Sequence, residues 1–234
     1  MTGFGEKNVI VTGGAGALGV AVITALSVAG ATCYVPCLTD HEAQRLGQHK
    51  VSRVSATVVG DLADEHAVET FFTGVPDLWA SIHLAGGFAF GPFAELGKVG
   101  LMQQIEMNLV TAALCCRAAV AAMQRTGRGG RIVNVAARPA LEWRTGAGMV
   151  AYTASKAGVA ALTVALAEEV VQMGILVNAV APSILDTPAN REAMPNADHA
   201  KWPKVDEVAA TILFLASPEN KVTRGAIVPV YGKS

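Results

Sequence analysis

Short apolar runs alternate along the chain with longer segments in which Ala, Leu and Val recur every three or four residues. The short runs have the length and the β-branched content of buried strands, and they predict strands at residues 8–11, 32–35, 55–59, 79–84, 130–135, 175–180 and 226–230. The longer segments predict helices at residues 17–29, 65–72, 101–125, 148–173 and 205–215. This alternation predicts an α/β fold with a Rossmann-like, doubly wound parallel sheet of about seven strands.

Residues 183–204 follow neither pattern, and they contain Pro188, Pro195 and Pro203. Prolines at this density disfavour both helix and sheet, so we predict a loop that serves as a lid over a substrate. Nothing else in the 234 residues has the composition of an interdomain linker. We therefore expect a single domain over residues 1–234.

Hydrophobic residues make up 52% of the chain and charged residues 16%, while the net charge is −1. With so few charges and no basic run, we expect no nucleic acid and no anionic membrane surface as a partner, and a small molecule as the substrate. No apolar run has the length and purity of a membrane span, and the N-terminal residues lack the pattern of a signal peptide.

The cysteines follow neither a metal-ligand spacing nor a disulfide pattern. They are Cys33, Cys37, Cys115 and Cys116. We interpret them as reduced thiols, which predicts a cytoplasmic protein without a metal site.

A glycine-rich segment lies between the first predicted strand and the first predicted helix. Glycines allow a tight turn and let backbone N–H groups approach a phosphate, while the helix N-terminus adds partial positive charge. A strand before such a loop and a helix after it are the setting in which it binds the pyrophosphate of a dinucleotide. The predicted cofactor contacts here are Gly13, Ala15, Gly16, Ala17, Leu18 and Gly19.

The choice between NAD and NADP stays open at this point. Cys37 stands near the end of the second predicted strand, where an acidic residue would bind the ribose hydroxyls of NAD. Asp40 lies three residues further on, and Arg45 is the candidate for the 2′-phosphate of NADP. After the third strand, Asp61 and Leu62 are candidates for contacting adenine, with a helix cap as the alternative for Asp61.

Tyr152 and Lys156 stand four residues apart in a predicted helix, so their side chains share a face. A nearby cation stabilises phenolate, and Lys156 is therefore predicted to lower the pKa of Tyr152 toward the range of a general acid or base. Such a pair can transfer a proton, although a Tyr and a Lys at this spacing also occur by chance.

The motifs described above and several others occur in one order along nearly the whole chain. Because its motifs occur in this order, the sequence resembles the short-chain dehydrogenase/reductase family. The resemblance implies an NAD(P)-dependent oxidoreductase in which Tyr152 is the catalytic acid and Lys156 also binds the nicotinamide ribose. It implies that Asn108 holds a water in a proton relay, with a structural asparagine bonded to backbone as the alternative. Further cofactor contacts implied by the resemblance are Ala85, Gly86, Gly87, Pro182 and Thr187, with a turn cap as the alternative for Thr187.

The chain departs from the family pattern after the fifth predicted strand. The family has a serine there that donates a second hydrogen bond to the substrate oxygen, whereas this chain has Ala136 and Ala137. Residues 185–198 resemble the dihydropteridine reductase branch of the family, which also lacks the serine. This resemblance implies that the substrate is a quinonoid dihydropteridine. Such a conjugated acceptor spreads its negative charge, so it needs a second donor less than a simple ketone does.

Three residues near the predicted catalytic helix are candidates for substrate contact. Ala137 lies where the serine would be. Trp143 either stacks on a planar ring or covers the core or a subunit contact. Thr145 either replaces the serine or is a loop hydroxyl in water.

Three functional hypotheses follow. The first is an NAD(P)H-dependent reductase that acts on a conjugated cyclic acceptor, and the second is a carbonyl or 3-oxoacyl reductase. The third is a non-catalytic, NAD(P)-binding regulatory protein. The helices predicted at 101–125 and 148–173 carry more apolar surface than one side of a sheet needs, which predicts a homodimer or homotetramer formed through them.

Overall fold

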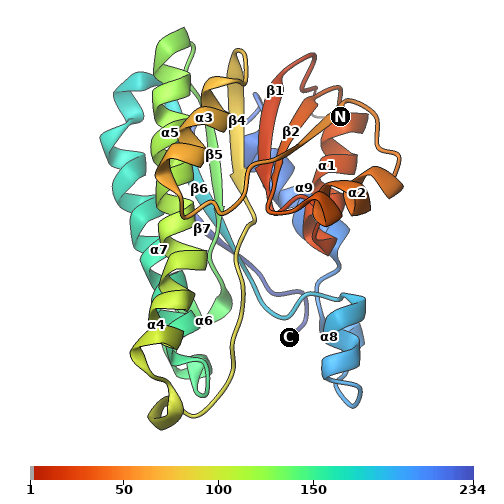
Figure 1. Ribbon diagram of the computed structural model, residues 1–234, viewed down its shortest axis with the longest axis vertical. Helices are drawn as coiled ribbons and strands as arrows, with labels where there is room; N and C mark the ends of the chain where they lie inside the picture. The colour runs from red at the N-terminus through yellow and green to blue at the C-terminus, as the bar shows by residue number, and fades with distance from the viewer. Residues whose placement is uncertain (1–2) are drawn as a thin grey trace.

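The computed structural model describes residues 3–234, and it contains one sheet of 7 strands (Figure 1). The strand order is β3-β2-β1-β4-β5-β6-β7, and every neighbouring pair is parallel. The strands are β1 (Asn8–Thr12), β2 (Thr32–Cys37), β3 (Val54–Val58), β4 (Leu78–His83), β5 (Gly130–Val135), β6 (Ile175–Pro182) and β7 (Ile227–Val230). The predicted fold class is therefore confirmed.

Helices cover both faces of the sheet. Figure 1 shows α1, α2 and α9 on one side and α3, α5 and α7 on the other, with α4, α6 and α8 toward the lower end. The helices are α1 (Ala17–Val28), α2 (Asp40–Gln48), α3 (Glu65–Thr73), α4 (Lys98–Ile105), α5 (Thr111–Thr126), α6 (Arg138–Leu141), α7 (Val150–Glu169), α8 (Pro188–Ala193) and α9 (Val205–Ala216).

The core lies on both faces of the sheet, as parallel strands require. In β1, Val11 belongs to the cluster with Ile212 of α9, whereas its neighbour Ile10 belongs to the cluster with Phe72 of α3 and Met123 of α5. Successive side chains of a strand point to opposite faces, which explains why one short apolar run supplies both cores.

The helix predicted at residues 101–125 is one helical stretch over residues 98–126, with a π-helical turn inside it. A π-helical turn, Glu106–Val110, separates α4 from α5, and Asn108 is buried within it. The helix predicted at residues 148–173 is α7 followed by a 3-10 turn, Val171–Met173.

Residues 183–204 are more ordered than their sequence predicted, because α8 lies within them. Thr187 is the N-cap of this helix, and its hydroxyl accepts a hydrogen bond from the backbone N–H of Asn190 at 3.2 Å. Pro188 fits the first helical position, where the N–H that it lacks would have no partner. The N–H of Asp186 donates to the carbonyl oxygen of Pro203 at 2.9 Å, which joins the two ends of the segment.

Two helical stretches, residues 98–126 and 150–169, are long and apolar enough to span a membrane by length and composition alone. Both stretches lie against the sheet, since α5 contacts β4 and α7 contacts β6. Packing on the sheet explains the buried part of each stretch, which is 44% of the apolar window in the first and 33% in the second.

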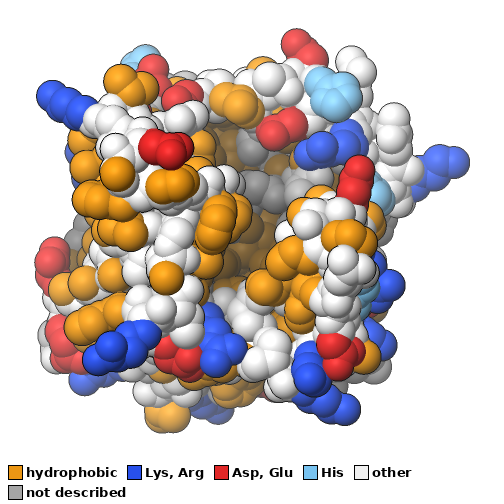
Figure 2. Space-filling model, turned by 90° about the horizontal axis from the view of Figure 1, so that it is seen from below, with side chains coloured by type: hydrophobic (Ala, Val, Ile, Leu, Met, Phe, Trp, Pro, Cys, Tyr) orange, Lys and Arg blue, Asp and Glu red, His pale blue; other side chains and the backbone are white. Residues whose placement is uncertain are grey.

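The carboxyl ends of the strands lie at the lower end of the molecule in Figure 1. Figure 2 looks at this end and shows a hollow between two raised flanks, with hydrophobic side chains along its edges. The chain order reverses at β1, which pairs with β2 on one side and with β4 on the other. Parallel α/β sheets bind their ligands at such a reversal, outside the carboxyl ends of the strands.

Candidate active site

The glycine-rich loop turns sharply between β1 and α1. Gly13 has a φ of +65°, and a Cβ at this position would lie 2.7 Å from the backbone nitrogen of Ala85. A Cβ on Gly19 would collide with the carbonyl oxygen of Gly13. Only glycine fits at both positions, so the loop can pack tightly against its own helix and against the segment after β4.

The amino end of α1 suits an anion. Gly16 is the N-cap and has no side chain to accept hydrogen bonds from the first helical turn. The backbone N–H groups of this turn have no partner within the helix, and the helix dipole adds positive potential at the same end. The backbone around Gly16 is therefore suited to an anion, and binding of a pyrophosphate by this cradle stays a prediction.

The segment after β4 is fixed by two polar side chains. Thr12 accepts a hydrogen bond from the N–H of Ala85 at 3.1 Å, a contact that the sequence did not predict. Asn108 accepts one from the N–H of Gly87 at 3.1 Å, and its amide nitrogen donates to the carbonyl oxygens of Gly87 and Gln104, both at 3.0 Å. The side chain of Asn108 thus has the backbone-bonding role that was one of its two alternatives.

Lys156 lies beside this segment. A Cβ on Gly86 would come 2.5 Å from Oδ1 of Asn108 and 3.4 Å from Nζ of Lys156. The ammonium group donates to the carbonyl oxygen of Val135, at the end of β5, at 2.8 Å. Three parts of the chain, namely α7, β5 and the segment after β4, therefore meet at the lysine.

Tyr152 lies one turn before Lys156 on α7. The ring of Phe88 packs edge-on against the tyrosine ring, with the two ring centroids 5.1 Å apart. Burial raises the pKa of Tyr152 to about 12, and burial lowers the pKa of Lys156 to about 8. The prediction that Lys156 lowers the pKa of Tyr152 is wrong for this arrangement, because the ammonium is bonded to Val135 and desolvation of the phenol dominates.

In the family pattern a serine after β5 acts together with the Tyr–Lys pair, and in this chain the corresponding position is apolar. Ala136 and Ala137 follow β5 directly, and both are buried. Ala137 has an extended backbone and precedes α6 without capping it through a side chain. The chain therefore presents a methyl group where the family pattern has a hydroxyl.

A family model described as short chain dehydrogenase matches residues 7–198 of this chain. The chain belongs to this family. Galactitol 2-dehydrogenase from Rhizobium johnstonii is 32% identical to it, over 96% of this chain and 93% of the relative. The (2S)-[(R)-hydroxy(phenyl)methyl]succinyl-CoA dehydrogenase subunit BbsD from Thauera aromatica is 30% identical, over 98% of this chain and 97% of the relative. The predicted NAD(P)-dependent oxidoreductase of the short-chain type is thereby confirmed.

Solved structures agree with the fold. A short-chain type dehydrogenase/reductase from Mycobacterium ulcerans superposes with a TM-score of 0.89 at 21% identity, covering 99% of this chain and 90% of the other. A single-residue variant of actinorhodin polyketide ketoreductase, solved with NADPH, gives a TM-score of 0.85 at 23% identity, covering 97% and 96% of the two chains.

In this short-chain dehydrogenase the end of β2 carries no exposed charge of its own. Cys37 is buried there, and burial raises the pKa of its thiol. The N–H of the following residue, Leu38, donates to the carboxylate of Glu42 at 2.8 Å. Arg45 lies one turn further along α2 and is exposed. An acidic and a basic side chain thus both stand near the end of β2. The chain binds NAD or NADP.

Asp61 and Leu62 have local roles in the structure. Asp61 accepts a hydrogen bond from the N–H of Ala63 at 2.9 Å, while the N-cap of α3 is Asp64. Leu62 packs against the core on the α3 and α5 side. The alternative that Asp61 caps the helix is therefore wrong, because the cap lies three residues further along the chain. Contact with adenine stays a prediction for both side chains.

Pro182 and Thr187 lie on the way from β6 to α8. Pro182 is the last residue of β6 and pairs with Val230 of β7. Thr187 is the N-cap of α8, which is the turn-cap alternative left open by the sequence. The hydroxyl of Thr187 accepts from the N–H of Asn190, and the contact of Pro182 and Thr187 with the nicotinamide stays a prediction.

Trp143 and Thr145 lie in the 3-10 turn between α6 and α7. The side chain of Trp143 is 74% exposed, which rules out a core position within this chain, and its indole N–H donates to the carbonyl oxygen of Ala140 at 3.0 Å. The hydroxyl of Thr145 donates to the carbonyl oxygen of Glu142 at 2.8 Å and is exposed. Neither contact brings these side chains to Tyr152, and their substrate contacts stay predictions.

Behind the site, β4 and β5 share a buried polar network. His83 bonds to Ser81 and to Asn134, each at 2.8 Å, and Asn134 donates to Thr163 of α7 at 2.9 Å. Burial lowers the pKa of His83 to about 4, so the imidazole stays neutral. The network ties α7 to the central strands and gives His83 the role of a satisfied core histidine.

Proposed function

We propose that this oxidoreductase works as an NAD(P)H-dependent reductase of a conjugated, cyclic acceptor, with quinonoid dihydropteridine as the specific candidate. The observation that carries the proposal is the pairing of a protonated Tyr152 with a methyl group at Ala137. A pKa of about 12 keeps the phenol protonated at neutral pH, so Tyr152 carries the proton that a reduction consumes.

A bound nicotinamide dinucleotide would supply the hydride. The cradle around Gly13 and the amino end of α1 holds its pyrophosphate, and Lys156 binds its ribose hydroxyls while keeping the bond to Val135. Tyr152 transfers its phenolic proton to a heteroatom of the substrate as the ring is reduced. The ring of Phe88 packs against the tyrosine ring on one side.

The missing hydroxyl favours a delocalised acceptor. Reduction of a plain ketone places negative charge on one oxygen, and loss of one preorganised donor at such an oxygen costs roughly a hundred-fold or more in rate. A quinonoid or conjugated imine acceptor spreads the same charge over several heteroatoms, so Tyr152 alone suffices for it.

A carbonyl or 3-oxoacyl reductase is the second candidate, because the relatives at 32% and 30% identity carry names of dehydrogenases that act on galactitol and on an acyl-CoA. Retention of both Tyr152 and Lys156 argues against the third hypothesis, a non-catalytic regulatory protein. A cofactor sensor would have no use for a buried phenol beside a buried ammonium.

An acceptor screen with NADH and NADPH tests the proposal. We expect oxidation of cofactor with quinonoid dihydropterin and little with simple ketones, and we expect Tyr152→Phe to lower turnover by about a hundred-fold or more at unchanged cofactor affinity. Preference for ketones in the wild-type protein would favour the second candidate. Cofactor binding without turnover of any acceptor would favour the regulatory protein.

We further propose a homodimer or homotetramer that forms through α5 and α7 and resides in the cytoplasm. Val164 and Ala161 of α7 are exposed although they are apolar, which supports an interface there. All four cysteines are free and buried, which is compatible with a reducing compartment.

A further inference from the structure

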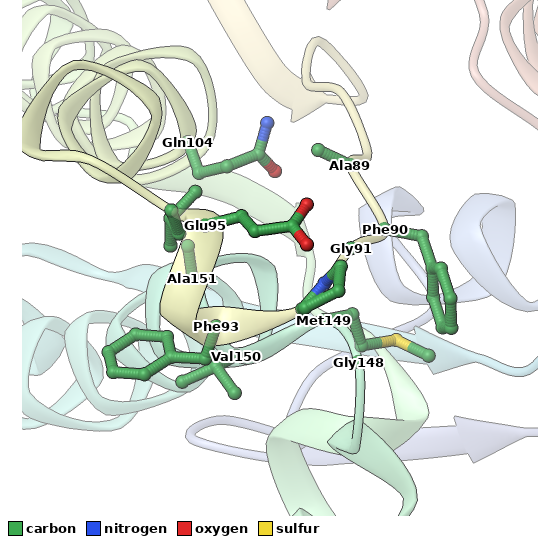
Figure 3. A pocket seen from close by; sticks show the side chains of 12 residues that line it. Ala89, Phe90, Gly91, Phe93, Glu95, Gln104, Gly148, Met149, Val150 and Ala151 are labelled. Carbon is green, nitrogen blue, oxygen red and sulfur yellow. The ribbon is translucent and has the colours of Figure 1, made fainter.

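NAD and NADP differ by one phosphate on the adenosine ribose, so the residue that selects between them lies at that ribose. The pocket between the segment after β4 and the start of α7 is not this place (Figure 3), because neither the glycine-rich loop nor β2 contributes to its lining. The glycine-rich loop follows β1, and β2 pairs with β1 in parallel. The selecting residue is therefore expected at the end of β2.

The end of β2 itself lacks a charged side chain. Ile10 of β1 lies opposite Tyr34 of β2, and this register, continued for three residues, places Cys37 level with Gly13 of the glycine-rich loop. In dinucleotide sites an acid at such a position binds the ribose hydroxyls of NAD, whereas a nearby arginine binds the 2′-phosphate of NADP. Cys37 is 1% exposed, so its thiol does neither. The charge has to come from a neighbouring side chain.

Glu42 of α2 brings a carboxylate to this strand end. Its Oε2 accepts a hydrogen bond from the N–H of Leu38, the first residue after β2, at 2.8 Å. Thr39 caps α2 and accepts from the N–H of Glu42 at 3.3 Å, which holds the first helical turn against the strand end. The other carboxylate oxygen, Oε1, is accessible to solvent, and no donor within residues 3–234 bonds to it. This oxygen is therefore available to a hydroxyl group of a ligand.

Two other charged side chains of α2 stand near this position. Asp40 is the first residue of α2, and Arg45 lies one turn after Glu42; both are exposed. Burial raises the pKa of the Cys37 thiol most, the charge of Glu42 raises it further, and the charge of Arg45 lowers it by less. Of the charges on α2, the negative charge of Glu42 therefore acts most strongly on the strand end.

We propose that Glu42 selects NAD(H) over NADP(H), because its carboxylate accepts a hydrogen bond from the 2′-hydroxyl of the adenosine ribose and repels a 2′-phosphate. The acid that dinucleotide sites carry at the strand end thus comes here from the first turn of α2. A phosphate in place of the hydroxyl removes the donor and sets two negative groups side by side, so both effects act against NADP(H). This selection depends on the cofactor alone and not on the acceptor proposed above.

Calorimetric titration with NADH and with NADPH, without any acceptor, tests the selection. We expect the wild-type protein to bind NADH about ten-fold more tightly than NADPH, or better. Glu42→Gln keeps an oxygen that accepts from Leu38 but removes the charge. This variant should weaken NADH binding several-fold and tighten NADPH binding, so the preference for NADH should fall by about ten-fold or more.

Asp40→Asn and Arg45→Gln are the matched controls, since each removes one charge from an exposed position of the same helix. Both should keep the preference for NADH. Thermal unfolding without nucleotide separates selection from helix capping. Glu42→Gln should unfold close to the wild-type temperature, because its amide oxygen still accepts the hydrogen bond from Leu38.

Equal affinity of the wild-type protein for the two nucleotides, or a preference for NADPH, would overturn the inference. Parallel weakening of both nucleotides by Glu42→Gln would also overturn it, because that is the result expected if Glu42 only stabilises the start of α2. A change of preference in Asp40→Asn or Arg45→Gln but not in Glu42→Gln would assign the selection to another side chain. Preference for NADH through Glu42 without turnover of any acceptor would support the inference and overturn the proposed reductase function.

Discussion

Burial moves the pKa values of Tyr152 and Lys156 away from their ordinary values in opposite directions, because desolvation disfavours the charged form of each group. The tyrosine is thereby kept as a phenol, and the lysine is brought close to the point of losing its proton. The bond from the ammonium to the carbonyl oxygen of Val135 holds the lysine in place in spite of this cost.

The pKa of Lys156 predicts a pH dependence of stability. Its value is about 8 in the folded chain against 10.5 for an ordinary lysine, so between these values the unfolded chain binds a proton that the folded chain does not. The free energy of unfolding therefore rises with pH in this window, by about 3 kcal/mol in total for this group. Urea denaturation at pH 7 and pH 10 should show this rise in the wild-type protein, beyond any rise in Lys156→Met.

Lys98→Met serves as the control, since Lys98 is exposed. Its pH dependence should follow the wild-type curve. If Lys156→Met gains as much stability between pH 7 and pH 10 as the wild-type protein does, burial does not lower the pKa of this lysine.

Ala137→Ser tests the argument from charge delocalisation. A hydroxyl here would supply the second donor of the family pattern, so turnover of simple ketones should rise by about ten-fold or more while turnover of a conjugated acceptor changes little. Ala136→Ser is the matched control, because Ala136 packs into a small core cluster with Ala140 and Ala181. Steady-state rates with a simple ketone and with a conjugated acceptor measure the effect. Unchanged ketone turnover in Ala137→Ser would contradict the argument that the missing hydroxyl favours a conjugated substrate.

At the residue scale, the sequence predicted the placements that follow from local spacing. Tyr152 and Lys156 stand one helical turn apart, and Gly13 and Gly19 flank one turn, so short-range geometry suffices for both pairs. The bond from Ala85 to Thr12 joins residues that are 73 positions apart, and the packing of Phe88 on Tyr152 is likewise remote in sequence. Such contacts depend on how the strands are ordered, which no local pattern contains.

At the element scale, the π-helical turn at Glu106–Val110 is a local change of hydrogen-bond pattern inside one helical stretch, and the sequence did not predict it. The apolar period runs through this stretch without a break, so the sequence predicted one helix. Asn108 bonds to both backbone groups of Gly87, and the extra residue in the turn accommodates that bond. The unpredicted α2 and α8 are short, and their caps, Thr39 and Thr187, were the available signals.

Asn108→Ala should destabilise the protein by about 2–4 kcal/mol, because it leaves the N–H and the carbonyl oxygen of Gly87 without their partner. It should also weaken cofactor binding, since the segment after β4 lies against Gly13 of the phosphate cradle. Urea denaturation and cofactor titration measure the two effects. Gln103→Ala, in the exposed part of α4, is the control, and a variant of Asn108 with wild-type values in both assays would contradict the structural role.

At the scale of the whole molecule, the sequence predicted the fold class, because a parallel sheet needs a crossover between successive strands. The alternation of short apolar runs with amphipathic segments therefore leaves few arrangements, and the observed order is one of them. The polar network of His83, Asn134 and Thr163 joins the two central strands to α7. The sequence did not predict that these residues bond to one another. Only the pairing of β4 with β5 brings the first two residues together.

The exposed apolar residues of α7 lead to the last prediction, which concerns assembly. Val164 is 43% exposed, and Ala161 and Ala165 lie on the same exposed side of the helix. In a two-fold interface whose axis passes near Val164 of α7, this residue faces its own copy in the partner, so Val164→Arg brings two positive charges together in a desolvated place. Sedimentation velocity should show a dimer or tetramer for the wild-type protein and a shift toward monomer for this variant.

Val28→Arg should leave the assembly unchanged, because Val28 is 81% exposed on α1, on the opposite side of the sheet (Figure 1). A monomeric wild-type protein would refute the interface. Dissociation by the Val28 variant alone would show that the interface lies on the other face of the molecule.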